Sequence, residues 1–160
     1  MTKRLVHELT YDAPAERVSA MLADPAFRNE VCAFQGVLRQ QVTIKPVGDG
    51  MEVTIDQWQP TAGMPSFAKK IVGDETNIVQ REFWSSPLLG DITVTIPGKP
   101  GDMTGTVRVD ETDGRTVETV DLAIKVGIPL VGGKLESLIS DLLLTALKAE
   151  NKVGRDYLSR

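Results

Sequence analysis

Cysteine and histidine are almost absent from this sequence. Cys32 is the one cysteine among 160 residues, and His7 is the one histidine. An intrachain disulfide therefore cannot form, and a cysteine-rich zinc site is excluded. The motifs H-x-x-x-H and G-x-S-x-G are missing as well, and so are clustered metal ligands. We accordingly predict no catalytic residue, no metal and no cofactor.

Long apolar runs and an excess of positive charge are also lacking. No stretch approaches about 18 uninterrupted apolar residues, so a transmembrane helix is not expected. The basic N-terminus is followed by no apolar run of signal-peptide length, which favours a cytoplasmic location. The 18 Lys and Arg residues against 22 Asp and Glu give a net charge of −4. Because binding to phosphates depends on clustered positive charge, we expect no nucleic-acid partner.

The sequence GIPLVGGK resembles a phosphate-binding loop only in part. Gly127 and Gly132 have the spacing of such a loop, but Gly133 stands where the lysine is required. Lys134 comes one residue late, and Leu135 replaces the hydroxyl residue that binds magnesium. We interpret the segment as a junction between a strand and a helix, with glycines that allow the backbones to approach closely.

Length and composition fit one soluble domain. The chain has 160 residues, of which 41% are hydrophobic and 25% charged. A domain of this size removes roughly 70% of its unfolded surface from water, which permits a sizeable core without a metal or a disulfide. We predict a single domain over residues 1–160.

The N-terminal part predicts one strand and two short helices. Residues 3–11 alternate between polar and apolar side chains, which is typical of a strand. Pro14 suits the first turn of a helix, and an apolar stripe follows it. Asp24 then resembles an N-cap with Pro25 at the first helical position, and Gly36 is placed to end this second helix.

The remainder predicts a sheet followed by one long helix. Residues 37–126 form six short strand-like runs separated by turn residues, which favours an antiparallel meander. One irregular piece interrupts them, and its Met64 and Phe67 make it a candidate gate over an opening. From residue 135 to residue 157 apolar side chains recur at helical spacing.

The element order, together with the segment HELTYDAPAERVSAMLADPAF and the long terminal helix, resembles the START-like (SRPBCC) superfamily. This resemblance covers essentially the whole chain, and the superfamily includes birch-pollen allergens and polyketide cyclases. It implies an α+β helix-grip fold, in which a curved seven-stranded antiparallel sheet wraps around a long C-terminal helix. Two short helices lie between strands 1 and 2 of such a fold.

Four further segments resemble an uncharacterised actinobacterial branch of these helix-grip proteins. They are MPSFAKKIVG, REFW, IPGKPGDMTG and IPLVGGKLESLI. The resemblance does not imply one activity, because the superfamily contains lipid carriers, hormone receptors, cyclases, hydrolases and chaperone activators.

The middle of the final helix is apolar on most of its circumference, because Leu142, Leu143 and Leu144 are consecutive. An apolar surface this wide needs cover on several sides. A cavity for a ligand between the sheet and the helix would explain it, and so would a solid core or a dimer contact. Since START-like proteins often keep space there, the leading hypothesis is binding or transport of a hydrophobic small molecule, such as a lipid, a sterol or a polyketide-like compound.

The predicted cavity is lined by side chains of the sheet, the final helix and the irregular piece. They are Ile55, Met64, Phe67, Trp84, Val94, Met103, Val107, Leu122, Leu135, Ile139 and Leu142. The candidate polar groups of the cavity are His7, Tyr11 and Arg81. Arg81 and Glu82 alternate in direction along a strand, so one of them is expected inside, where a buried charge needs a partner.

Two other functions stay open on the sequence alone. One is an enzyme of the cyclase or dehydratase type that transfers protons through a polar cluster around His7, Tyr11 or Arg81. That hypothesis requires these side chains to converge inside the cavity. The other is a partner-binding module or a homodimer, in which a second chain covers the apolar surface.

Overall fold

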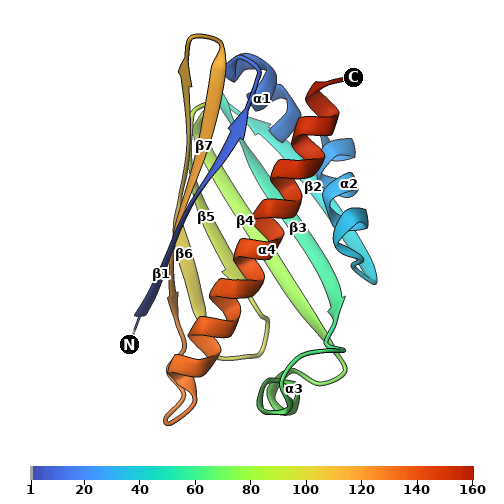
Figure 1. Cartoon of the computed structure of the whole chain (residues 1–160), viewed down its shortest axis with the longest axis vertical. Helices are drawn as coiled ribbons and strands as arrows, with labels where there is room; N and C mark the ends of the chain where they lie inside the picture. Colours follow the sequence, from blue (N-terminus) through green and yellow to red (C-terminus); the bar gives the residue numbers. More distant parts are fainter. Residues whose placement is uncertain (1) are drawn as a thin grey trace.

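A long helix crosses one face of a curved antiparallel sheet, and two shorter helices flank it (Figure 1). The structure is a computed structural model that describes residues 2–160. In chain order the elements are β1 (Thr2–Tyr11), α1 (Ala15–Leu22), α2 (Pro25–Gln35), β2 (Arg39–Val47), β3 (Gly50–Pro60), α3 (Ser66–Val72), β4 (Glu75–Ser86), β5 (Leu89–Thr95), β6 (Asp102–Thr112), β7 (Arg115–Lys125) and α4 (Gly132–Leu158).

The sheet is a meander that the first strand completes. Its seven strands, all within residues 2–160, are ordered β1-β7-β6-β5-β4-β3-β2, and each neighbouring pair is antiparallel. β1 therefore lies beside β7, the strand that leads into α4. The predicted helix-grip fold, with two short helices between the first two strands, is confirmed.

Local signals in the sequence explain where α2 begins and ends. The side chain of Asp24 accepts a hydrogen bond of 2.9 Å from the backbone N–H of Ala26, and Pro25 occupies the first turn. At the other end Gly36 has a φ of 72°, a left-handed conformation that favours glycine. These two caps fix the length of α2 and hence the position of the side chains on its inner face.

The irregular piece between β3 and β4 contains a short helix, α3, which the sequence did not predict. Phe67 and Ala68 of α3 pack with Val126 and with Leu135 and Ile139 of α4 in a small apolar cluster apart from the main core. α3 lies at the end of the fold at which α4 begins (Figure 1). Within residues 2–160, no helix is both long enough and apolar enough to cross a membrane.

The middle of α4 is less covered than the sequence predicts. Leu143 and Leu144 are half-buried against the main core, but Leu142 is 44% exposed. The prediction that Leu142 lines a cavity is therefore wrong, because its side chain faces solvent. Further along, α4 packs tightly on β1 at Gly154, where a Cβ atom would lie 2.7 Å from Cε1 of Tyr11.

This close approach makes Gly154 a test of how α4 docks on the sheet. We expect Gly154→Ala to destabilise the protein by about 1–3 kcal/mol, because the buried ring of Tyr11 has little room to move. Gly133→Ala is the matched control in the same helix. It meets no atom within 4 Å and should be neutral or stabilising by up to about 1 kcal/mol. Urea unfolding measures both, and equal stabilities would contradict the packing described.

Candidate functional site

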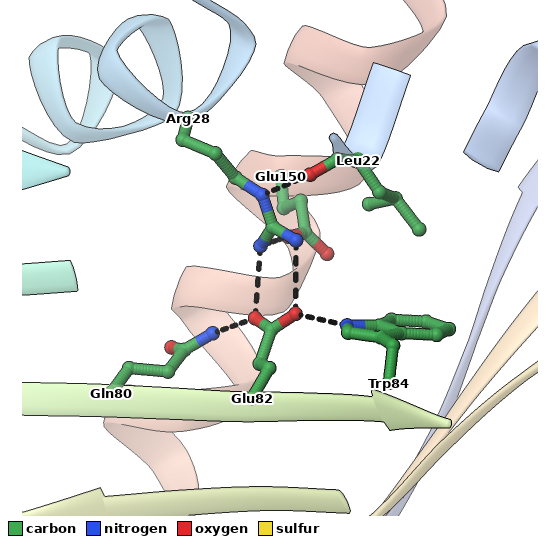
Figure 2. A network of polar contacts seen from close by, with 6 residues as sticks. All are labelled: Leu22, Arg28, Gln80, Glu82, Trp84 and Glu150. Carbon is green, nitrogen blue, oxygen red and sulfur yellow. Dashed lines mark hydrogen bonds and ion pairs between the residues drawn. The ribbon is translucent and has the colours of Figure 1, made fainter. Parts of the chain in front are cut away.

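A buried arginine on α2 is paired with a glutamate on the sheet. The side chain of Arg28 is 2% exposed, and its Nη1 and Nη2 donate hydrogen bonds of 2.9 Å each to the two carboxylate oxygens of Glu82 (Figure 2). Its Nε donates at 2.8 Å to the backbone carbonyl of Leu22, the last residue of α1. Arg28 thus joins α1, α2 and β4 inside the protein.

Two neighbours on β4 complete the contacts of Glu82. The side-chain amide of Gln80 donates to Oε2 at 2.6 Å, and the indole N–H of Trp84 donates to Oε1 at 2.8 Å (Figure 2). Burial acts to raise the pKa of Glu82. The charge of Arg28 and the hydrogen bonds from Arg28, Trp84 and Gln80 outweigh that effect, so the pKa lies below its ordinary value. Glu82 is therefore an ionised carboxylate that these contacts hold in position.

Two more carboxyl groups lie near Arg28 without such support. Glu150 of α4 has its Oε1 3.8 Å from Nη1 of Arg28, beyond hydrogen-bond distance, and its side chain is 12% exposed. Glu118 of β7 is 3% exposed, and its Oε1 has no hydrogen-bond partner in the described part of the chain. We call Arg28, Glu82, Glu118 and Glu150 the arginine cluster. It contains three carboxyl groups and one guanidinium group.

Burial shifts the ionisation of these two carboxyl groups toward the neutral form. Burial, opposed in part by Arg28 and reinforced by Glu82, raises the pKa of Glu150 to about 7. The pKa of Glu118 lies well above its ordinary value because of burial and, after it, the neighbouring Glu150. Both acids therefore hold a proton more tightly than an exposed glutamate does, and the charge of Glu150 changes near neutral pH.

Tyr11 borders the arginine cluster from β1. Its side chain is 2% exposed, and its hydroxyl has no hydrogen-bond partner within residues 2–160. Burial raises the pKa of Tyr11, and the negative charges of Glu118 and Glu150 raise it further. Asn151 is its polar neighbour and acts to lower the pKa, but the two side chains do not meet in hydrogen-bond geometry. A buried polar group without a partner is rare in folded proteins.

A small cavity adjoins the arginine cluster between α2, α4 and the sheet. Its volume is about 60 Å³, which is room for roughly two water molecules. Its lining residues are Arg28, Val31, Cys32, Gln35, Ile55, Gln57, Gln80, Ile92, Val94, Leu122, Leu143, Ala146, Leu147 and Glu150. This is the space in which the sequence predicts a larger apolar cavity. The walls are partly polar instead, and the volume is below that of ordinary ligand sites.

A larger apolar hollow lies on the other side of the arginine cluster. It has a volume of about 470 Å³, is open to solvent on one side, and is bordered by the α1–α2 junction, the β2–β3 hairpin and the β4–β5 turn. Its lining residues are Ser19, Ala20, Leu22, Ala23, Pro25, Ile44, Pro46, Asp49, Gly50, Met51, Trp84, Ser86 and Pro87. Leu22 and Trp84 connect the two features, because each lines the apolar hollow and each is hydrogen-bonded to the arginine cluster.

The predicted lining residues are distributed over several places. Ile55, Val94 and Leu122 border the small cavity, and Trp84 borders the apolar hollow. Met103 and Val107 belong to the main core. Of the other five, Leu142 is exposed and Met64 is half-buried in the turn before α3. Phe67, Leu135 and Ile139 lie in the apolar cluster with α3.

The predicted polar groups do not come together. Arg81 is exposed on the outer face of the sheet, so its prediction as a polar group of the cavity is wrong, and Glu82 is the member of this pair that points inward. His7 is half-buried and Tyr11 is buried. No hydrogen bond or ion pair joins His7, Tyr11 and Arg81 in the described residues, so they do not form the proton-transfer cluster that the enzyme hypothesis required of them.

Sequence reasoning missed Arg28, Glu118 and Glu150, although their spacing contained a signal. Arg28 stands three and four positions before the buried Val31 and Cys32, on one face of α2. On β7 every second residue is buried, and Glu118 occupies one of these buried positions, two residues before Val120. A charged residue at a position that the period assigns to the core needs a partner, and that requirement identifies the site.

The seven-stranded antiparallel sheet, the long C-terminal helix and the short helices form a Bet v 1-like helix-grip fold. Residues 6–158 match the family described as "Protein of unknown function (DUF2505)", and the chain belongs to it. No curated protein matches the sequence.

Solved structures share the fold over nearly the whole chain. Truncated norcoclaurine synthase from Thalictrum flavum is 16% identical, with a TM-score of 0.63 over 96% of this chain and 93% of that chain. Ara h 8.0201 is 9% identical, with a TM-score of 0.63 over 100% of both chains. The di-domain ARO/CYC StfQ from the steffimycin biosynthetic pathway is 8% identical, with a TM-score of 0.63 over 98% of this chain and 50% of that chain.

The Arg28–Glu82 pair predicts unequal effects of removing either partner. Arg28→Met should cost about 3–5 kcal/mol, because it leaves the Glu82 carboxylate buried without its cation. Glu82→Gln should cost less, because Glu150 lies 3.8 Å from Arg28 and can ionise in its place. Arg108→Met is the control, since its ion pair with Asp110 is exposed and should contribute less than about 1 kcal/mol. Urea unfolding at neutral pH gives the values, and similar losses for Arg28→Met and Arg108→Met would contradict the burial of the pair.

The raised pKa of Glu150 predicts a dependence of stability on pH. The folded protein binds this proton more tightly than the unfolded chain, so the stabilisation is complete below pH 4.5 and is lost as pH rises through about 7. The loss should amount to about 3 kcal/mol, at roughly 1.4 kcal/mol per pH unit. Glu150→Gln should reduce this slope but not abolish it, because the raised pKa of Glu118 acts in the same direction, whereas Glu52→Gln, on the exposed face of β3, should retain the wild-type slope. Unfolding curves between pH 5 and pH 8 test this, and a Glu150→Gln slope equal to wild type would refute it.

Proposed function

We propose that the protein binds a hydrophobic small molecule in the apolar hollow between the α1–α2 junction and the end of the sheet. The observation that supports this most is the hollow itself. Its volume of about 470 Å³ falls within the range of about 300–1,000 Å³ that is usual for ligand sites, and its walls include Leu22, Ile44, Met51 and Trp84. The proposal moves the predicted ligand from beneath α4 to the α1–α2 side of the arginine cluster.

Affinity in such a site would come mainly from removing apolar surface from water, at about 25 cal/mol per Å². Asp49 is the charged residue of the lining and lies exposed at the β2–β3 hairpin, where it can fix the orientation of a polar end of the ligand. Ser19 is engaged elsewhere, because its hydroxyl donates to the carbonyl of Pro87 at 3.0 Å. The site therefore favours a ligand with an apolar body and at most one polar end.

The neighbours in fold support a small-molecule site in general terms. Norcoclaurine synthase from Thalictrum flavum has been solved in complex with dopamine and hydroxybenzaldehyde. StfQ is an ARO/CYC protein of a biosynthetic pathway. By analogy of fold we propose a lipid, a sterol or a polyketide-like compound as the ligand here. We further propose a cytoplasmic, actinobacterial protein that forms one domain over residues 1–160, and a homodimer remains an alternative way to cover its apolar surface.

A second candidate function is acid–base catalysis of the cyclase or dehydratase type. The observation that favours it is Glu150, whose carboxyl borders the small cavity and whose pKa of about 7 suits a general acid or base near neutral pH. The reacting group of a substrate would have to fit a cavity of about 60 Å³.

Native mass spectrometry of the protein with a cell lipid extract tests the binding site. We expect a discrete added mass that disappears on denaturation. Ala20→Trp should reduce it at least about tenfold, because Ala20 lines the apolar hollow and an indole would occupy the space of the ligand. Ala33→Trp is the matched control, on the exposed face of α2 and outside the apolar hollow, and should bind as wild type does.

Two results would contradict the proposed site. Binding that Ala20→Trp leaves unchanged would place the ligand elsewhere, and an absence of added mass in all three proteins would refute the carrier function. The same experiment addresses the second candidate. A bound mass that loses one water over time in wild type, but not in Glu150→Gln, would show dehydration.

A further inference from the structure

The arginine cluster contains three carboxyl groups and one guanidinium group, and all four side chains are buried or nearly buried. Arg28 forms its two-pronged pair with Glu82, and this pair is neutral as a whole. Glu118 and Glu150 are then left over, from β7 and α4 respectively, and neither receives a hydrogen bond in residues 2–160. A buried carboxylate without a partner is costly, whereas the neutral acid is tolerated.

We propose that Glu150, with Glu118 behind it, is a proton switch for the contact between α4 and the sheet. With both acids neutral, the inner face of α4 rests on the sheet and the small cavity keeps its volume of about 60 Å³. When Glu150 loses its proton, its charge competes with Glu82 for Arg28, and α4 loosens around the small cavity. This inference deepens the proposed function, because it concerns the regulation of the same ligand site and its ligand-dependent part rests on that function.

The surroundings of Glu150 favour a switch over a permanent charge. The groups that face it are Arg28 and Cys32 of α2, Glu82 of β4, Glu118 of β7 and Tyr11 of β1. One of these is a cation already engaged by Glu82, and two are acids. Ionised Glu150 would therefore meet one shared positive charge and a neighbouring negative one. Burial also raises the pKa of the Cys32 thiol, so Cys32 stays neutral and adds no charge beside Glu150.

One face of α4 carries the residues that would respond to the charge of Glu150. Leu143, Ala146, Leu147 and Glu150 all border the small cavity, and their spacing of three and four residues puts them on one side of α4. Three apolar side chains and one acid thus share the contact. Beyond this face, Gly154 holds α4 close to Tyr11. The contact that Glu150 controls is limited to about two turns of the helix, from Leu143 to Glu150.

The apolar hollow is connected to this switch through two hydrogen bonds. Arg28 holds the carbonyl of Leu22, and Glu82 holds the indole N–H of Trp84. Both residues line the apolar hollow. If Arg28 turns toward an ionised Glu150, one or both of these bonds lengthen and two walls of the hollow shift. Ligand affinity should then depend on pH, and by linkage a bound ligand should change the proton affinity of Glu150.

Hydrogen exchange of the ligand-free protein tests the switch directly. A carboxyl with a pKa of about 7 in the closed state and 4.5 in the open state favours opening about thirtyfold more at pH 8.5 than at pH 5.5. After correction for the intrinsic pH dependence of exchange, amides of residues 143–153 should show this increase. Glu150→Gln should show none, and Glu8→Gln, on the exposed face of β1, should behave as wild type.

A spectroscopic measurement reports on the connection to the apolar hollow. In a Trp58→Phe background Trp84 is the sole tryptophan, and its emission should change between pH 5.5 and pH 8.5 with the same midpoint as the exchange. In Glu150→Gln the emission should stay constant. Glu118→Gln should leave the midpoint nearly unchanged, because burial, Arg28 and Glu82 set the pKa of Glu150.

Each outcome decides between the switch and its absence. Exchange in residues 143–153 that is independent of pH in wild type, or equally dependent in Glu150→Gln, would overturn the proposal. If Glu150→Gln does not fold, a carboxyl NMR titration of wild type replaces it, and an ordinary pKa for Glu150 would overturn the proposal equally. These experiments need no ligand. A working switch without any bound mass would therefore count against the proposed function alone, and pH-independent ligand binding against the switch alone.

Discussion

The pairing of one buried guanidinium with a carboxylate sets how the helices and the sheet of this protein meet. Arg28 contacts the end of α1 through the carbonyl of Leu22 and contacts β4 through Glu82. A buried charge tolerates little displacement from its partner, so the pair fixes the position of α2 over the sheet. It also fixes which face of β4 is inside. With Glu82 inward, Trp84 is inward as well, and Arg81 must be outward.

The same pairing leaves two further buried carboxyl groups without a cation of their own. One cation can be shared by only so many carboxylates, and three lie around Arg28. A structural ion pair would have been complete with Glu82 alone. Replacement of Glu118 or Glu150 by an apolar residue would have removed an obvious cost of burial. Acids that remain at such positions, beside a cavity and an unpartnered tyrosine hydroxyl, are typical of functional sites, where shifted pKa values are arranged for use.

The sequence predicted most helices and strands because they depend on local patterns, and the resemblance to START-like proteins implied how they are arranged. The period of two along the strands and the caps Asp24 and Gly36 of α2 are contained in short windows. The helix α3 was missed because seven residues are too few to show a helical period. The site was missed for a different reason. Arg28 and Glu82 are 54 positions apart, and no local pattern indicates that they pair. Glu82 was recognised only as one of two residues that could face inward.

The place of the apolar hollow follows from a second non-local pair, Trp84 and Gly90. They lie opposite each other on β4 and β5, and a Cβ atom at position 90 would be 2.8 Å from Cδ2 of the indole. Only glycine lets the ring lie against β5. In that position the indole N–H reaches Glu82, and the ring borders the apolar hollow at the same time. The side chain of Trp84 thus packs against Gly90 of β5, donates a hydrogen bond to Glu82 and forms a wall of the proposed ligand site. The arginine cluster and the apolar hollow therefore meet at Trp84.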